Sequence, residues 1–236
     1  MTVWLTLAGV FIAVLASAQT THSPATSGAA LLVLPRPGVP ISLEQIEERS
    51  RKLEDGTTAV VGVIKSKVYR DSAGRLRMES EIQDSSGHSS TRYADLVDPV
   101  AGSRVVLLTT EKVGYRVPFP KSDQSRLAFL GMGESSQDSR HKWGDARTEV
   151  VGKRTIQGVE LEGTRIIRTA EGEPGLTDTI EQWYSDELKL IGLLTSAGPS
   201  EAYSARIQSL QRGEPDPALF TTPAEYKIID LQLPQK

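Results

Sequence analysis

Through most of the chain after residue 57, apolar and polar side chains alternate at every second position. Leu76, Met78 and Ile82, for example, are interleaved with charged residues at positions 75, 77, 79 and 81. Successive side chains of a β-strand point to opposite faces of a sheet, so this alternation indicates strands with one apolar and one charged face. The sequence therefore predicts a sheet with one face in water and the other face covered.

Segments of this kind recur at hairpin spacing, separated by turn signals such as Asp71-Ser72-Ala73-Gly74. They comprise residues 57–70, 75–82, 93–98, 105–109, 113–119, 148–154, 159–169, 177–185, 188–195 and 202–210. Short turns can join antiparallel strands, whereas parallel strands need crossover connections of about a dozen residues or more. We therefore expect a mainly β protein with a single antiparallel sheet of about ten strands.

The segment before residue 57 has two interpretations. Ser42-Leu43-Glu44-Gln45 has the form of a helix capping box, and Leu43, Ile46 and Leu53 lie near one helical face. Asp55-Gly56, in contrast, is a strong hairpin signal that favours a first strand before it. The residues alone do not decide between a helix and a strand for this segment.

The N-terminus has the features of an export signal. Residues 3–15 are almost wholly apolar, and Ala16-Ser17-Ala18 follows as a small-x-small cleavage site. The run is shorter than the roughly 20 apolar residues that span a bilayer. We predict a signal peptide over residues 1–18 with cleavage after Ala18, a flexible Pro/Ser/Thr-rich tether over 19–41, and a single β domain over 42–236. The protein is then periplasmic or secreted, with no integral membrane span after leader removal. No Lys or Arg stands between Met1 and the apolar run, although secretory leaders usually begin with a positive charge. A retained anchor and a different start codon are therefore the alternatives.

The alternation stops between residues 120 and 144, for a stretch longer than most connections in a compact domain. Ser122 has the type of an N-cap for a short helix that carries Leu127, Phe129 and Leu130. We expect either a surface excursion or one or two short helices that form a lid over the apolar face.

Residue types that carry chemistry are sparse. The chain has no cysteine, and its histidines, His22, His88 and His141, have no metal-ligand spacing. No serine lies in a G-x-S-x-G elbow. We therefore expect no catalytic residue, no metal and no cofactor in a non-enzymatic protein, with a hydrolase as a remote alternative. A formal charge of -3 from 27 basic and 30 acidic residues also excludes a strong electrostatic attraction to nucleic acid.

The apolar face itself is the remaining candidate for a site. It is either a filled core or, in part, a cavity for an acyl chain, because ligand pockets are mostly apolar with few polar groups. The candidate ligand-binding residues on this face and in the expected lid are Leu76, Met78, Ile82, Val113, Tyr115, Val117, Leu127, Phe129 and Leu190.

Four segments carry a resemblance to a group of uncharacterised secreted bacterial proteins, typical of acidobacteria. They are Lys67–Arg75, Asp98–Gly102, Gln182–Ser185 and Gln211–Phe220 with Pro223. The resemblance covers the chain from about Leu43 to its end. In that group the segment around Asp55-Gly56 is a hairpin, which implies a strand over residues 43–53.

The succession of strands and the ending Asp216-x-x-x-Phe220-x-x-Pro223 also resemble the periplasmic lipoprotein carrier LolA and its relatives, including the sensor RseB. That resemblance implies a curled antiparallel half-barrel whose concave apolar face holds acyl chains under helical lids. No position matches the carrier's lid-locking arginine, so no functional residue is transferred. We expect a protein that binds a hydrophobic ligand, such as a lipid, an acyl chain or a lipidated protein, in the cell envelope. The alternative is a periplasmic sensor or adaptor that binds another envelope protein.

Overall fold

Twelve strands of one sheet make up the described part of the chain. The computed structural model describes residues 32–83, 86–119, 144 and 146–231. The strands are β1 (Ile41–Lys52), β2 (Thr58–Arg70), β3 (Leu76–Gln83), β4 (Ser89–Asp98), β5 (Ser103–Leu108), β6 (Val113–Pro118), β7 (Arg147–Ile156), β8 (Val159–Ala170), β9 (Glu173–Ser185), β10 (Leu190–Ala197), β11 (Glu201–Arg212) and β12 (Lys227–Asp230). One short 3-10 helix, η1 (Pro217–Phe220), lies between β11 and β12.

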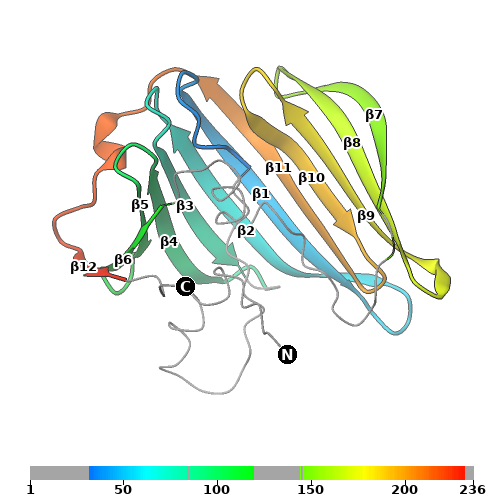
Figure 1. Ribbon diagram of the computed structural model, residues 1–236. Helices are drawn as coiled ribbons and strands as arrows, with labels where there is room; N and C mark the ends of the chain where they lie inside the picture. Colours follow the sequence, from blue (N-terminus) through cyan, green and yellow to red (C-terminus); the bar gives the residue numbers. More distant parts are fainter. Residues whose placement is uncertain (1–31, 84–85, 120–143, 145, 232–236) are drawn as a thin grey trace.

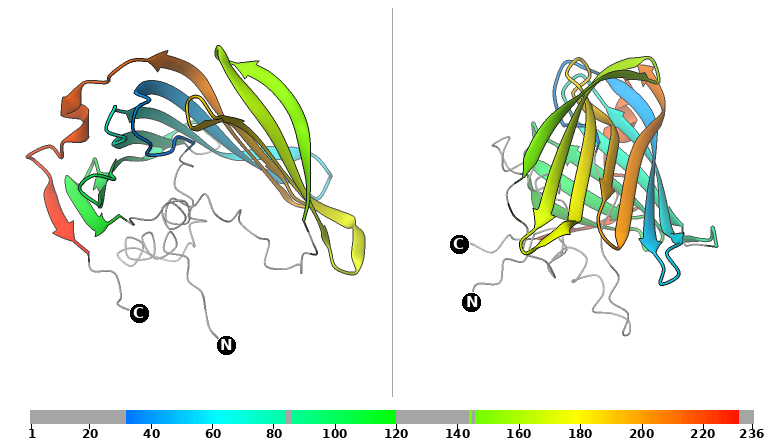
Figure 2. Two further views of the ribbon diagram at one scale, coloured as in Figure 1. Left: turned by 45° about the horizontal axis from the view of Figure 1, so that its top comes forward. Right: turned by 90° about the vertical axis from the view of Figure 1, so that its right-hand side faces the viewer.

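The sheet is unclosed and curled. Its strand order is β12-β6-β5-β4-β3-β2-β1-β11-β10-β9-β8-β7, so β1 and β11 lie side by side at its centre. Every neighbouring pair is antiparallel except β12 with β6, which is parallel. Figures 1 and 2 show the strands arching over a concave side. The expected single antiparallel sheet is confirmed at this level.

The expected strand number was wrong, because the sheet has twelve strands and not about ten. The two strands outside the ten alternating segments are β1, for which the residues left a helix open, and β12. The alternation could not reveal β12. It is only four residues long and follows Pro223, and it pairs with the edge strand β6 instead of forming a hairpin with its sequence neighbour β11. Strands this short carry too few residues for a period of two to stand out. The helix expected near Ser122 falls outside the described residues.

Residues 41–52 form a strand and not a helix. Leu43 lies opposite Val68 of β2 on one side and Leu210 of β11 on the other. The capping-box pattern is therefore overridden by pairing on both edges of β1, a tertiary effect that local propensity cannot anticipate. The Asp55-Gly56 hairpin turn expected after it is present, with Gly56 at a positive φ of 82°.

Gly74 shows why the turn between β2 and β3 needs glycine. Its φ is +81°, and a Cβ built on it would lie 2.8 Å from the backbone nitrogen of Pro37. Segment 32–40, part of the residues expected to form a tether, thus lies against this turn. Leu32 and Val33 of the segment are fully buried, and Val33 forms a β-bridge with Leu190.

The main core lies between two parts of the same sheet. β10 pairs with β11 only over Leu193–Ala197, so the start of β10 is separate from β11. There it pairs instead with the segment around Val33, and both lie against the β1–β4 half. The core cluster contains residues of both halves: Val33, Ile41, Leu43, Val68, Leu76, Met78, Val97, Phe119, Val159, Leu161, Trp183, Leu188, Leu190 and Ile207.

The other face of the sheet carries charged side chains over much of its area, as the alternation predicted. On β4 and β5, however, it holds a second buried cluster, Ala94, Leu96, Val105 and Leu107, against which Tyr226 and Ile228 pack. Pairs such as Arg165 with Glu181 at 2.7 Å and Arg92 with Glu81 at 3.5 Å connect neighbouring strands. Opposite charges on adjacent strands stabilise a sheet modestly and keep its outer face soluble. The carboxylates of this face are therefore surface groups of the fold.

Candidate ligand-binding face

The register of the strands arranges side chains in rows across one face. We call this the inner face and define it by Leu43, Val68 and Met78, which lie opposite one another on β1, β2 and β3. Val33 belongs to the same cluster as these residues, and its segment runs inside the curve of the sheet in Figure 2. The inner face is therefore the concave one.

Three of these rows contain candidate ligand-binding residues. The first runs across Ile41, Arg70, Leu76, Val97, Arg104 and Val117. The second runs across Leu210, Leu43, Val68, Met78, Asp95, Val106 and Tyr115. The third runs across Ile207, Gln45, Ser66, Ser80, Tyr93, Leu108 and Val113. The face thus changes from apolar to polar along β1, β2 and β3, while β5 and β6 stay apolar in the third row.

Four of the residues expected to line a ligand site are fully buried. Leu76, Met78 and Leu190 belong to the main core cluster, and Val117 is 1% exposed. Core side chains of this kind pack against other protein atoms and can support a site only from behind. This part of the face is a filled core.

The other described candidates, Ile82, Val113 and Tyr115, are half-buried on the inner face. Val113 and Tyr115 lie on β6, next to Leu108 and Val106 of β5, which are also half-buried. This places an accessible apolar strip on β5 and β6. Leu127 and Phe129 lie outside the described residues.

Arg70 holds the filled part of the face together. Its guanidinium donates to the carbonyl oxygens of Val39 at 2.8 Å, Leu34 at 2.9 Å, Lys189 at 3.3 Å and Leu188 at 2.6 Å. These carbonyls come from segment 32–40 and from the β9–β10 turn, so one side chain connects both to β2. Burial lowers the pKa of Arg70 to about 10.

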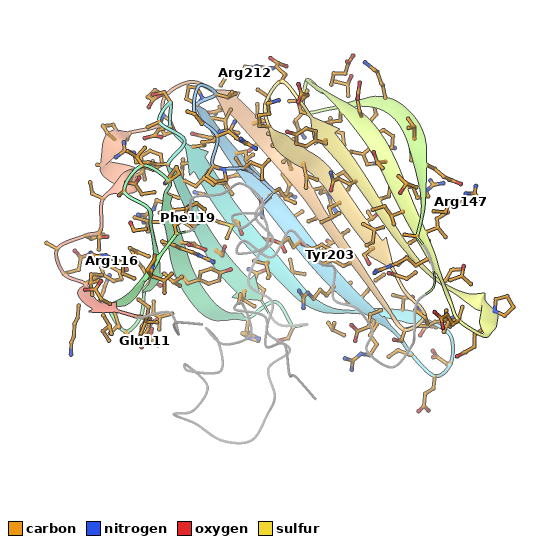
Figure 3. The ribbon with its side chains drawn as sticks, viewed as in Figure 1. Glu111, Arg116, Phe119, Arg147, Tyr203 and Arg212 are labelled. Atoms are coloured by element: carbon orange, nitrogen blue, oxygen red, sulfur yellow. The ribbon has the colours of Figure 1, made fainter. Side chains whose placement is uncertain are left out.

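Next to the filled part lies a group of polar side chains that we call the polar belt, which consists of the buried Gln45, Glu47, Ser66 and Ser80 and the half-buried Tyr203. The Tyr203 hydroxyl donates to Glu47 Oε2 at 2.7 Å, and Gln45 Nε2 donates to Glu47 Oε1 at 3.0 Å. The hydroxyls of Ser66 and Ser80 are 2.8 Å apart. Gln45, Glu47, Ser66 and Ser80 are all less than 5% exposed. Figure 3 shows Tyr203 near the middle of the sheet, at the junction of its two halves.

The charges around the belt are balanced. Burial and then the neighbouring Glu47 carboxylate raise the pKa of Tyr203, which keeps its hydroxyl protonated. The guanidinium of Arg49 lies 5.7 Å from the centre of the Tyr203 ring. In the adjacent rows Arg104 pairs with Asp95 at 2.5 Å; burial acts against the Arg104 charge, but Asp95 outweighs it and raises the pKa of Arg104.

The belt was not predicted from the sequence. Glu47 and Gln45 fall in the segment whose helical and strand patterns competed, so the face to which they point was not assigned. Once β1 is known to be a strand, Gln45 and Glu47 share the phase of Leu43 and belong inside. A polar residue at an apolar phase is the signal that would have found them.

The described residues show neither a metal-binding group nor a membrane-spanning helix. No group of three or more His, Asp or Glu side chains within residues 32–83, 86–119 and 146–231 is arranged to hold a metal. His88 contacts Ser86 at 2.7 Å in the exposed turn between β3 and β4, and His22 and His141 lie outside the described residues. None of the helices in the described part has the length and apolar character of a membrane span.

No family model and no curated protein matches the sequence. Among solved structures, the Pseudomonas aeruginosa MucA/MucB complex matches with 15% identity and a TM-score of 0.41, covering 83% of this chain and 61% of that chain. The Mycobacterium tuberculosis lipoprotein LppX matches with 11% identity and a TM-score of 0.34, covering 74% and 87%. A LolA superfamily protein from Nitrosomonas europaea matches with 9% identity and a TM-score of 0.33, covering 79% and 91%.

The likeness to LolA-type proteins that the sequence suggested is thus also found among solved structures, as a likeness of fold. The chain spans about three fifths of the length of the matched chain in that complex.

Proposed function

We propose that this chain is an exported, non-enzymatic protein that binds a lipid or another acyl-bearing molecule on its inner face. The observation that carries the proposal is the strip of half-buried apolar side chains on β5 and β6, which continues the face beyond its filled core. Val106, Leu108, Val113 and Tyr115 form this strip in two adjacent rows. A flexible acyl chain laid along it would bury apolar surface at about 0.8 kcal/mol per methylene.

The test is to isolate the protein with its leader removed, extract it with organic solvent and assay binding of diphenylhexatriene, an uncharged hydrocarbon probe. Lipid should be found in the extract, and the probe should bind. Replacing Val113 by Asp places a charge in the strip and should weaken probe binding at least tenfold. Val100→Asp is the matched control, because Val100 is 77% exposed in the β4–β5 turn. A lipid-free extract together with no probe binding would defeat the proposal.

Export belongs to the same proposal. A cleaved leader predicts that protein recovered from outside the cytoplasm begins at Gln19, directly after Ala18. N-terminal sequencing measures this. Recovery of the intact N-terminus in the membrane fraction would favour a retained anchor.

A second candidate function is binding of another envelope protein through strand β7. This strand is at one end of the sheet order, pairs with β8 and exposes 87% of Val150. An edge strand can accept another strand by backbone hydrogen bonding. A stoichiometric protein partner captured from envelope extract, and lost with Val150→Asp, would support this function. Capture that is unaffected by Val150→Asp would assign the contact to another surface.

A further inference from the structure

Arg49 brings a positive charge to the inner face at the centre of the sheet. It lies on β1 opposite Tyr203 of β11, and its guanidinium carbon is 5.7 Å from the centre of the Tyr203 ring. Arg49 is half-buried, so part of its side chain is open to solvent. Two other arginines of this face are already engaged, since Arg70 donates to four carbonyl oxygens and Arg104 pairs with Asp95. Arg49, in contrast, has no ion-pair partner among the described residues.

Gly62 leaves open space beside Arg49. It lies opposite Arg49 on β2, so the two residues share the inner face. A Cβ built on Gly62 would meet no described atom within 4 Å. The strand has a bulge at the neighbouring Val61, but the φ of Gly62 is not positive, so the backbone does not require glycine there. A glycine inside a strand costs stability, and such positions often mark a close approach of a ligand to the backbone.

The buried carboxylate of the adjacent row, Glu47, is directed away from this space. Its oxygens accept from Tyr203 of β11 at 2.7 Å and from Gln45 of β1 at 3.0 Å, so its hydrogen bonds lead to β11 and β1 and not to β2. Arg49 therefore has an aromatic ring on its β11 side and unfilled space on its β2 side. The chain as a whole has a formal charge of -3 and does not attract anions. A preference for an anionic ligand would have to come from a local cation such as Arg49.

A path of accessible side chains leads from this space to the β5–β6 strip. Ile64 and Ile82 lie opposite each other in the next row of β2 and β3, and Ile82 is half-buried. Tyr93 of β4, which is also half-buried, is a diagonal neighbour of Ile82 and lies opposite Leu108 of the strip. The path thus crosses β2, β3, β4 and β5 in turn. A molecule lying along it would have one end at Arg49 and the other on the apolar strip.

From this arrangement we infer that the ligand of the inner face is an anionic amphiphile whose carboxylate or phosphate head binds Arg49 in the space over Gly62. Its acyl chain follows Ile82 and Tyr93 to the β5–β6 strip. The planar guanidinium donates paired hydrogen bonds to the oxygens of such a head, which suits an oxyanion better than a neutral or cationic group. The inference rests on the proposed function and adds the class of head group to it.

The first experiment compares four probes that share a ten-carbon chain: decanoate, decyl phosphate, decyl glucoside and decyltrimethylammonium. Each is titrated calorimetrically into the leaderless protein, below its micelle-forming concentration and at mildly alkaline pH, where both acids are ionised. At least one anionic probe should bind about tenfold more tightly than the neutral and cationic probes. Tighter binding of decanoate would assign a carboxylate head, and tighter binding of decyl phosphate a phosphate head. This comparison uses the unaltered chain, so it does not depend on the folding of a variant.

Arg49→Gln then tests the cation. It should reduce the preference for the anionic probe over decyl glucoside about tenfold, and Arg49→Lys should keep part of that preference because it keeps the charge. Arg206→Gln is the matched control, because Arg206 lies on β11 but is exposed on the outer face, where it pairs with Glu48 at 3.5 Å. The control should show the preference of the parent.

Gly62→Val tests the space without changing any charge. The valine side chain should occupy the place of the head group and weaken the anionic probe about tenfold. The free energy of unfolding should not fall, because the new Cβ meets no described atom within 4 Å and valine favours strands. Gly175→Val is the matched control, because Gly175 lies in β9 and a Cβ there is equally unobstructed.

Equal affinities for the anionic and neutral probes would overturn the inference, and so would unchanged binding of the anionic probe in Arg49→Gln or in Gly62→Val. Diphenylhexatriene, tested on the unaltered chain, separates this result from failure of the proposed function. If the hydrocarbon probe binds and the head groups are not distinguished, only the inference fails. If the hydrocarbon probe does not bind either, the ligand-binding function fails with it.

Discussion

Replacing Arg70 by Met tests how the filled part of the inner face is held. Methionine keeps an apolar stem of similar length but removes all four hydrogen bonds to the carbonyls of Leu34, Val39, Leu188 and Lys189. Those carbonyls belong to two chain segments far apart in sequence. The variant therefore loses the connection between both segments and β2 in one step.

The size of the expected stability loss depends on which hydrogen bonds each carbonyl keeps in the variant. Leu34 O also accepts from the Arg36 amide at 2.8 Å, and Lys189 O accepts from the Leu34 amide at 3.2 Å. Val39 and Leu188 receive the two shortest bonds from Arg70, at 2.8 and 2.6 Å. Leaving two buried carbonyls without that donor costs about 1–3 kcal/mol of stability each. Removing the buried guanidinium charge offsets part of this loss, because the charge no longer has to be kept out of water. We expect Arg70→Met to lower the free energy of unfolding by about 3 kcal/mol, a large share of a typical total.

Urea unfolding followed by circular dichroism measures this loss. Arg92→Met is the control, because the Arg92 side chain is 64% exposed and its pair with Glu81 should contribute less than about 1 kcal/mol. Arg70→Lys should be intermediate, since one compact ammonium cannot reach all four carbonyls at once. Cleavage by thermolysin at the Leu32–Val33 bond, which is buried in the parent, should also accelerate in Arg70→Met and would report release of segment 32–40. An Arg70→Met variant within about 1 kcal/mol of the parent would refute the reasoning.

Three more changes have definite expected outcomes. Gly163→Ala would place a Cβ 2.8 Å from the Trp183 ring, and this overpacking should cost about 1–3 kcal/mol in urea unfolding. Glu181 has a lowered pKa because Arg165 and then Trp183 donate hydrogen bonds to its carboxylate, so it stabilises the fold above its unfolded pKa near 4.5. That contribution disappears as pH falls through the lower folded pKa, and the stability gap between the parent and Glu181→Gln should narrow from about pH 6 to pH 3. Tyr203 has a raised pKa, so its contribution is complete below its unfolded pKa near 10 and is lost above it. As pH rises from about 10 to 11, the free energy of unfolding should therefore fall less in the Tyr203→Phe variant than in the parent. An equal fall in both proteins would contradict this prediction.

The antiparallel sheet was predictable because its signal is repeated in every strand. Leu76, Met78 and Ile82 point inward because alternate residues of a strand share a face, whatever the rest of the chain does. The strand at 41–52 was not decided by its residues, since its capping box and its hairpin signal conflict. Pairing with β2 and β11 decides it, and that pairing involves residues as distant as Arg212.

The division of the inner face into a filled and an accessible part was beyond sequence reasoning. Leu76 and Val113 have the same phase and the same apolar character, yet Leu76 is 1% exposed and Val113 is half-buried. The difference arises because the start of β10 separates from β11 and lies with Val33 against the β1–β4 half. A bulge between Ile191 and Leu193 marks the separation, and no periodicity in β10 announces it.

This separation also explains why polar groups can lie at the centre of the sheet. The filled core supplies the burial on which the fold depends, so the rows next to it need not be apolar. Glu47 and Tyr203 lie on β1 and β11, the two central strands, where both backbones are fixed by pairing on either side. The Tyr203 hydroxyl donates to one Glu47 oxygen at 2.7 Å and Gln45 donates to the other at 3.0 Å, so the buried carboxylate has a donor on each oxygen. The belt is therefore held together by its own hydrogen bonds, which limits the cost of leaving polar groups at the centre of the sheet.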